Sequence, residues 1–226
     1  DQLVTNDATP ILTGNYEALT LLVIEVNGVV YTLGSSAELT DPALDGNWQL
    51  DLSAAAPFAE GIYEVMATST DLANNVSADA SINELTIDFS GPTVSINPLI
   101  TQDQSPELTG NVDDPTAAVV VEVDGISYPA TNDGEGTWTL ADGTISPDLS
   151  FDTYDVIASA TDLAGNVGLD ATMDELIVVG PPESLNPTAI GNFQFTANWS
   201  MSAGVVSYAV DLALDNTFTD FIQRNL

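Results

Sequence analysis

The side chains of this sequence that could take part in chemistry are nearly all oxygen ligands. The chain has 34 Asp and Glu residues, a single basic residue, Arg224, and no His, Lys or Cys. This composition excludes Ser–His–Asp triads and Lys Schiff bases, and it lacks the usual ligands of zinc, copper, haem and iron–sulfur centres. Carboxylate, amide and carbonyl oxygens remain, and they are ligands for hard cations, chiefly Ca²⁺.

Several of these oxygen ligands lie in short polar segments. The β-sandwich that the strand pattern predicts would bring these segments to one pole of the domain. At the joint where the first copy of an internal repeat meets the second, the segments are 88–92, 112–116 and 162–166. We predict a Ca²⁺ site where they converge, completed by backbone carbonyls and formed by Asp88, Asp113, Asp114, Asp162 and Asn166. The first half offers a thinner set for the same purpose, consisting of Asp7, Glu17, Asp71 and Asn75.

The electrostatic argument for a cation is the mutual repulsion of converging carboxylates. Two carboxylates ~4 Å apart repel by about 4 kcal/mol at an effective dielectric constant of 20. Such a cluster must be protonated, spread into water or bridged by a cation, and Ca²⁺ accepts six to eight oxygens in irregular geometry. The alternative is that Asp162 and Asn166 are turn residues, because Asx side chains cap turns and tolerate left-handed backbone.

An internal repeat organises the elements that must position these residues. The run Thr9–Asn15 returns as Ser105–Asn111, an offset of 96 residues, and Thr70–Val76 returns as Thr161–Val167, an offset of 91. The order of matching segments is kept throughout, and the first copy carries a longer loop at residues 34–45. The repeat predicts two tandem domains, 1–90 and 91–180.

The pattern within each copy predicts strands. Residues 154, 156, 158 and 160 form an apolar face, and Asn27-Gly28 and Asp124-Gly125 lie between β-branched runs as hairpin turns do. About seven short strands in roughly 90 residues indicate an antiparallel β-sandwich. We expect Trp48 and Trp138 to fill the cores, with sugar stacking as the alternative, and Tyr63 and Tyr154 to be tyrosine-corner residues.

Residues 181–226 do not continue the repeat. Gly180-Pro181-Pro182 is a linker signal, and only 4 of the 34 acidic residues follow it. Two or three strands in 46 residues cannot bury a core of their own. We therefore interpret this segment as the start of a third domain that is cut short or completed by another chain, which would permit self-association through a donated strand.

These residues resemble the bacterial immunoglobulin-like repeats of large secreted or surface adhesins over about residues 5–180. The most specific part is Thr-Asp-Leu-Ala-Gly-Asn at 161–166, from which the first copy departs with Asn74 in place of Gly. The segment 192–221 resembles the first half of a bacterial fibronectin type III domain. The resemblance implies an all-β fold of tandem immunoglobulin-like sandwiches, a secreted or cell-surface location, and neighbouring domains in a longer chain with Ca²⁺ between them.

The net charge of −33 limits the partners. Nucleic acid and anionic membranes attract proteins through Lys and Arg, of which this chain has only Arg224. The sequence also has no run of 18 consecutive apolar residues, which a membrane-spanning helix would need. Thirty acidic residues without one basic residue in 1–180 repel one another, which favours an extended, soluble rod.

The function that these observations predict is a non-catalytic spacer in a multi-domain extracellular adhesin, stiffened by Ca²⁺ at its joints. One alternative is a calcium-dependent module that binds a surface glycan or a protein. The other is an accessory module of a secreted polysaccharide-degrading enzyme, since paired carboxylates about 5–9 Å apart can cleave glycosides.

Overall fold

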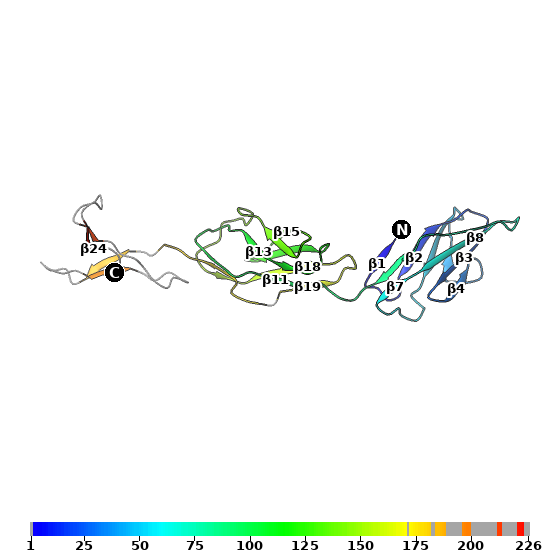
Figure 1. Ribbon diagram of the computed structural model, residues 1–226, viewed down its shortest axis with the longest axis horizontal. Helices are drawn as coiled ribbons and strands as arrows, with labels where there is room; N and C mark the ends of the chain where they lie inside the picture. The colour runs from blue at the N-terminus through cyan, green and yellow to red at the C-terminus, as the bar shows by residue number, and fades with distance from the viewer. Residues whose placement is uncertain are drawn as a thin grey trace. The chain divides into compact units, whose positions relative to one another are not determined.

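The computed structural model describes residues 2–170 and 172–181 and, beyond them, the backbone of four short strands. The described chain is built from strands and turns, without an α-helix (Figure 1). The described residues therefore contain no helix that is long and apolar enough to span a membrane. Two compact units contain it. The first unit comprises residues 1–93, 113–118 and 160–168, and the second comprises 94–112, 119–159 and 169–226.

The first repeat forms three small sheets, with strand orders β1-β10-β7, β2-β6-β5 and β4-β3-β8-β9. β1 pairs with β10 in parallel, and the other described pairings of this repeat are antiparallel. Its strands are β1 (Leu3–Thr5), β2 (Ile11–Asn15), β3 (Leu21–Val26), β4 (Val29–Thr32), β5 (Leu39–Thr40), β6 (Asn47–Asp51), β7 (Gly61–Tyr63), β8 (Val65–Thr70), β9 (Val76–Ala78) and β10 (Leu85–Ile87).

The second repeat forms two sheets, with strand orders β11-β13-β16-β15-β14-β18-β19 and β12-β20-β17. The larger sheet is continuous because β15 pairs with both β14 and β16. Its strands are β11 (Val94–Ile96), β12 (Leu99–Thr101), β13 (Leu108–Val112), β14 (Ala118–Val123), β15 (Ile126–Asn132), β16 (Thr137–Leu140), β17 (Thr153–Tyr154), β18 (Val156–Thr161), β19 (Val167–Leu169) and β20 (Leu176–Val178).

The two repeats match strand for strand except at two places. β5 lies in the longer loop of the first copy and has no described counterpart in the second. β11 has no described counterpart in the first copy, where the matching series begins with β1 in the position of β12. The Asn27-Gly28 and Asp124-Gly125 hairpins form as predicted, with φ between 49° and 75° at these four residues, the left-handed values that a two-residue hairpin turn requires.

The cores confirm the all-β sandwich prediction. Trp48 is 6% exposed and Trp138 is 0% exposed, so both belong to the cores, as expected. Ala158 and Ala160 form the predicted inward face of β18 and are fully buried. The Tyr63 hydroxyl donates to the Ala59 carbonyl at 2.9 Å and the Tyr154 hydroxyl to the Ser150 carbonyl at 3.0 Å, the hydrogen bond that defines a tyrosine corner.

Beyond residue 181 the structure gives four short strands, paired two by two as antiparallel ribbons. These are β21 (Ser184–Thr188), β22 (Thr196–Trp199), β23 (Leu212–Ala213) and β24 (Phe221–Gln223). The rest of the segment 192–221, on which the fibronectin type III resemblance depends, lies outside the described residues, as does the proposed self-association through a third domain.

Candidate metal-binding loops

The turn between β18 and β19 contains the two most specific predicted ligands. The Asp162 carboxylate accepts the Asn166 backbone N–H at 2.8 Å and the Asn166 side-chain Nδ2–H at 3.0 Å. The Asp162 N–H donates in return to the Asn166 carbonyl at 3.1 Å, and the Gly165 N–H donates to the Asp162 carbonyl at 3.3 Å. These hydrogen bonds are those expected of a closed Asx turn.

Asn166 also joins this turn to two other segments of the first unit. Its Nδ2–H donates to the Asp88 backbone carbonyl at 2.9 Å, and its Oδ1 accepts from the Asn6 side chain at 3.2 Å. The Asn6 backbone N–H donates to the Ala164 carbonyl at 3.2 Å. Two of the predicted ligands, Asp88 and Asn166, are thus in contact, but through the Asp88 backbone carbonyl and the Asn166 side-chain N–H. The Asp88 carboxylate instead accepts the Ser90 N–H at 2.9 Å.

Asp113 and Asp114 accept hydrogen bonds from backbone groups nearby. The Asp113 carboxylate accepts the Thr93 N–H at 2.7 Å, and the Asp113 N–H donates to the Thr93 carbonyl at 3.1 Å. The Asp114 carboxylate accepts the Thr116 N–H at 2.7 Å and its hydroxyl at 2.8 Å. Asp113 thus fixes the residue that precedes β11, and Asp114 caps its own turn.

The thinner set of the first repeat shows the same local use of carboxylates. Asp71 accepts the Ala73 and Asn75 N–H groups at 2.8 Å and the Asn75 side chain at 2.7 Å. Asp7 accepts the Thr9 N–H at 2.9 Å. Glu17 is exposed, and its backbone carbonyl accepts the Thr20 hydroxyl at 2.7 Å.

The acidity of these groups follows from their hydrogen bonds. Partial burial opposes ionisation of Asp162, but the hydrogen bonds from Asn166 and the loop backbone outweigh it, so the pKa of Asp162 lies below its usual value. The Thr93 N–H lowers the pKa of Asp113, and the Asn75 side chain lowers that of Asp71. All three are therefore carboxylates at neutral pH and act as acceptors.

Within the described residues, no group of three or more acidic side chains is close enough together to hold a metal ion. The carboxylates at these positions each accept hydrogen bonds from neighbouring backbone or side-chain groups. The observed hydrogen bonds are those of the turn-residue alternative, and calcium binding stays a prediction.

Sequence reasoning missed two residues that organise loops of the first unit. Asp41 is 6% exposed and accepts the Tyr16 hydroxyl at 2.9 Å and the Gly46 N–H at 3.1 Å. Burial opposes its ionisation, yet these hydrogen bonds keep its pKa below the usual value. Asn6 was missed as well, because nothing in a single polar residue before Asp7 indicates a partner 160 positions away.

This architecture defines a class, that of immunoglobulin-like β-sandwich domains in tandem. Comparison with protein families assigns residues 93–177 to the bacterial Ig-like domain family, which confirms the resemblance for the second repeat. No curated protein matches the chain.

Three solved structures show what the chain is similar to. A tetra-tandem repeat in the extending region of a large adhesion protein is 23% identical, with 80% of this chain and 49% of that chain covered and a TM-score of 0.39. The fibronectin(III)-like modules of Clostridium thermocellum CbhA are 11% identical, with 79% and 92% covered and a TM-score of 0.44. A 1.5-MDa bacterial ice-binding adhesin is 17% identical, with 81% and 63% covered and a TM-score of 0.36. The chain thus spans about half the length of the first of these structures and under two thirds of the third.

Proposed function

We propose that this chain is a non-catalytic spacer segment of a longer, extracellular bacterial protein of the adhesin kind. The observation that carries the proposal is the tandem arrangement: one chain contains two copies of the same sandwich, and the second matches a bacterial immunoglobulin-like family. Each copy buries a hydrophobic core of its own, so copies can be added to lengthen a protein without a new fold.

The charge of the chain supports the same role. Residues 1–180 contain 30 acidic residues and no basic one. At the ~8 Å screening length of physiological salt, neighbouring charges still repel, which opposes lateral sticking and collapse of a chain of domains. A spacer needs both properties, since it must project another domain without binding what it passes.

The experiment that tests this role separates a spacer from a binding module. The full chain is applied to a glycan array and is also inserted between a surface anchor and an unrelated binding domain on a displaying cell. We expect no saturable glycan binding, and we expect that deleting residues 1–180 shortens the reach of the displayed domain without changing its affinity. A specific, saturable glycan ligand would instead support the binding-module alternative, and hydrolysis of a polysaccharide would support the enzyme-associated one.

Calcium stiffening is the finer part of this proposal and has its own test. What supports it is the chain's supply of oxygen ligands and its lack of competing cations in 1–180. A carboxylate has two oxygens with about four acceptor positions, so Asp162 and Asp113 could bind the ion while they keep hydrogen bonds to the backbone. Calorimetric titration with millimolar Ca²⁺, with Asp162→Ala as the control, decides it: absence of heat ends the calcium proposal and leaves the spacer role intact.

A further inference from the structure

The first repeat contains a groove that the second repeat fills with a strand. The groove measures about 1240 Å³, and its lining includes residues of β2, β6, β8 and β9. In the second repeat the corresponding space lies beside β13, which is the counterpart of β2. There it holds β11, which pairs with β13 in antiparallel register, Val94 opposite Val112 and Ile96 opposite Gly110.

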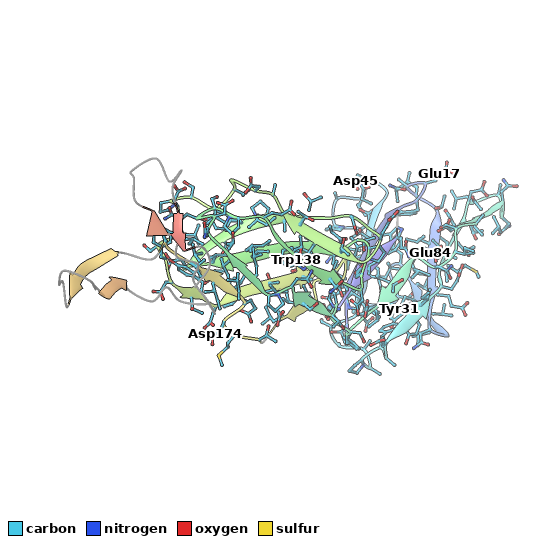
Figure 2. All side chains as sticks on the ribbon, turned by 60° about the vertical axis from the view of Figure 1, so that its left-hand side comes forward. Glu17, Tyr31, Asp45, Glu84, Trp138 and Asp174 are labelled. Carbon is cyan, nitrogen blue, oxygen red and sulfur yellow. The ribbon has the colours of Figure 1, made fainter. Side chains whose placement is uncertain are left out.

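A buried tryptophan marks the missing strand. In the second repeat the Trp138 indole N–H donates to the Ser95 backbone carbonyl of β11 at 3.0 Å, and the ring lies inside the sandwich (Figure 2). Its counterpart Trp48 is 6% exposed, and its indole Nε1 is buried without any hydrogen-bond partner. A buried donor without a partner is unfavourable because it loses its hydrogen bonds to water and gains none in the protein. Trp48 lines the groove, at the place where a strand carbonyl is needed.

The inner face of β8 gives a second, independent sign of vacancy. In the second repeat, Ala158 and Ala160 on β18 are both 0% exposed. Their counterparts Ala67 and Ser69 on β8 are only partly buried, and both line the groove. The inward face of a sandwich strand is therefore left open to solvent in the first repeat.

Carboxylates lie at both ends of the groove, as they do around β11. In the second repeat Asp113 accepts the Thr93 N–H at 2.7 Å and Asp170 accepts the Ile96 N–H at 2.7 Å. The sequence offsets place Glu17 and Asp79 at these two positions, and both line the groove. Backbone N–H groups of an incoming strand would find acceptors at both ends.

We propose that this groove is an acceptor site for one extended β-strand with the apolar-polar-apolar pattern of Val94–Ile96, running antiparallel to β2. The source to which we commit is the polypeptide on the amino side of Asp1, and in this respect the inference rests on the proposed tandem array. The second repeat shows the connection, because β11 leads through Asn97 and Pro98 directly into β12, whose counterpart is β1. Leu3 and Leu99 have the same parallel pairing and the same N–H···O bond of 2.7 Å, to Glu84 and Glu175 respectively.

One difference between the repeats limits the length of the strand. A Cβ added at Gly168 would overlap the Pro92 carbonyl, so the chain before β11 packs closely on this glycine. The counterpart in the first repeat is Ser77, which has a Cβ. The incoming chain should therefore follow the path of β11 from the position of Thr93 onward and diverge before it.

The test supplies the strand in two ways and follows the NMR signal of the Trp48 indole N–H, which has no hydrogen-bond partner. In one arm, four residues, Thr-Val-Ser-Ile, are joined to the amino side of Asp1, so that Asp1 and Gln2 take the places of Asn97 and Pro98. In the other arm, the hexapeptide Thr-Val-Ser-Ile-Asn-Pro is titrated into the unchanged chain. The reversed controls exchange the apolar and polar positions of the strand: Thr-Ser-Val-Ser replaces Thr-Val-Ser-Ile in the tether and in the peptide. This exchange turns the apolar side chain to the wrong face of the strand.

We expect the ¹⁵N–¹H indole signal of Trp48, assigned with Trp48→Phe, to move on tethering and to move saturably with the peptide. Amide exchange at the free edge of β2 should slow at least tenfold, and the melting temperature of the first repeat should rise by about 5 °C in the tethered chain. The reversed controls should show none of these changes.

Three outcomes overturn the inference: an unchanged indole signal in both arms, equal effects from the reversed controls, or a self-association of the unmodified chain that protects β2, since a second copy would then be the occupant. Each of these leaves the spacer role standing. Conversely, a glycan ligand would overturn the spacer role and leave the strand result untouched.

Discussion

The contrast between the two core tryptophans gives the sharpest prediction. Phe in place of Trp138 removes the indole N–H that bonds the Ser95 carbonyl at 3.0 Å, whereas Phe in place of Trp48 removes an N–H that bonds nothing. Both changes also shrink a core side chain, and that packing cost is common to the pair. The hydrogen bond is worth about 1 kcal/mol net, and the carbonyl left behind adds to the loss. The buried Trp48 N–H without a partner costs the first repeat about 1–3 kcal/mol, and Trp48→Phe removes that cost. We therefore expect Trp138→Phe to cost about 2–4 kcal/mol more than Trp48→Phe.

Native-state hydrogen exchange measures this difference, because it reports an opening free energy for each repeat within one chain. Amides of β16 report on the second repeat and those of β6 on the first. A difference of 1.4 kcal/mol corresponds to a tenfold difference in the loss of protection. Equal losses for the two variants, within about 0.5 kcal/mol, would refute the claim that Trp48 lacks a partner and that Trp138 has one.

Three further predictions concern the loop of Asp162 and Asn166 and the glycines that lie against the two core tryptophans. Asn166→Ala should destabilise the first unit by about 1–3 kcal/mol, because it removes hydrogen bonds to Asp162, Asp88 and Asn6, and chemical denaturation should show a smaller loss for the control Asn75→Ala. The lowered pKa of Asp162 means that its contribution to stability is complete above the ordinary value of 3.8 and is lost as the pH falls through the folded-state pKa. The protection of amides in its loop, corrected for the pH dependence of intrinsic exchange, should fall below about pH 4, and protection that stays constant with pH would contradict this. Gly110→Ala should lower the melting temperature of the second repeat by more than Gly14→Ala lowers that of the first. A Cβ at Gly110 meets both Trp138 and the Ser95 carbonyl, whereas at Gly14 the nearest atoms are all on Trp48.

Much of the fold is encoded locally and could be read from the sequence. The Asn27-Gly28 and Asp124-Gly125 turns require left-handed backbone, which these residues adopt at low cost, so both hairpins were predictable. The inward face of β18 was also predictable, from the alternation of apolar and polar residues in 154–161, because successive side chains of a strand point to opposite faces.

The candidate site could be predicted only in part, because side-chain direction is a tertiary property. The loops that carry Asp88 and Asn166 do approach each other, as their places in a sandwich require. The contact joins a carbonyl to an amide donor, however, and the Asp88 carboxylate turns to Ser90. The spacing of residues specifies which loops can meet, but whether a given oxygen faces its neighbour or its own backbone depends on packing.

The vacant strand position escaped sequence reasoning for a different reason. The offset of 96 residues places the counterpart of β11 before Asp1, so the two copies cannot be compared there by sequence. The groove is recognised in three dimensions instead, from an indole N–H without a partner and from the partly exposed inner face of β8. A comparison of matched residues in the two folded repeats therefore reveals the groove, which a comparison of the two sequences does not.

The hydrogen bonds of the acidic loops also explain how so anionic a chain can fold without basic partners. Asp71, Asp113 and Asp162 each accept backbone N–H groups, and in each case these bonds hold the pKa below its usual value. Ionised carboxylates form stronger hydrogen bonds than neutral acceptors do, so the negative charge itself tightens these turns. Backbone and amide donors thus satisfy locally what Lys and Arg satisfy elsewhere, but they leave the net charge of −33 uncancelled. The loops can therefore be well ordered while the chain as a whole continues to repel its neighbours, which is the combination that a spacer requires.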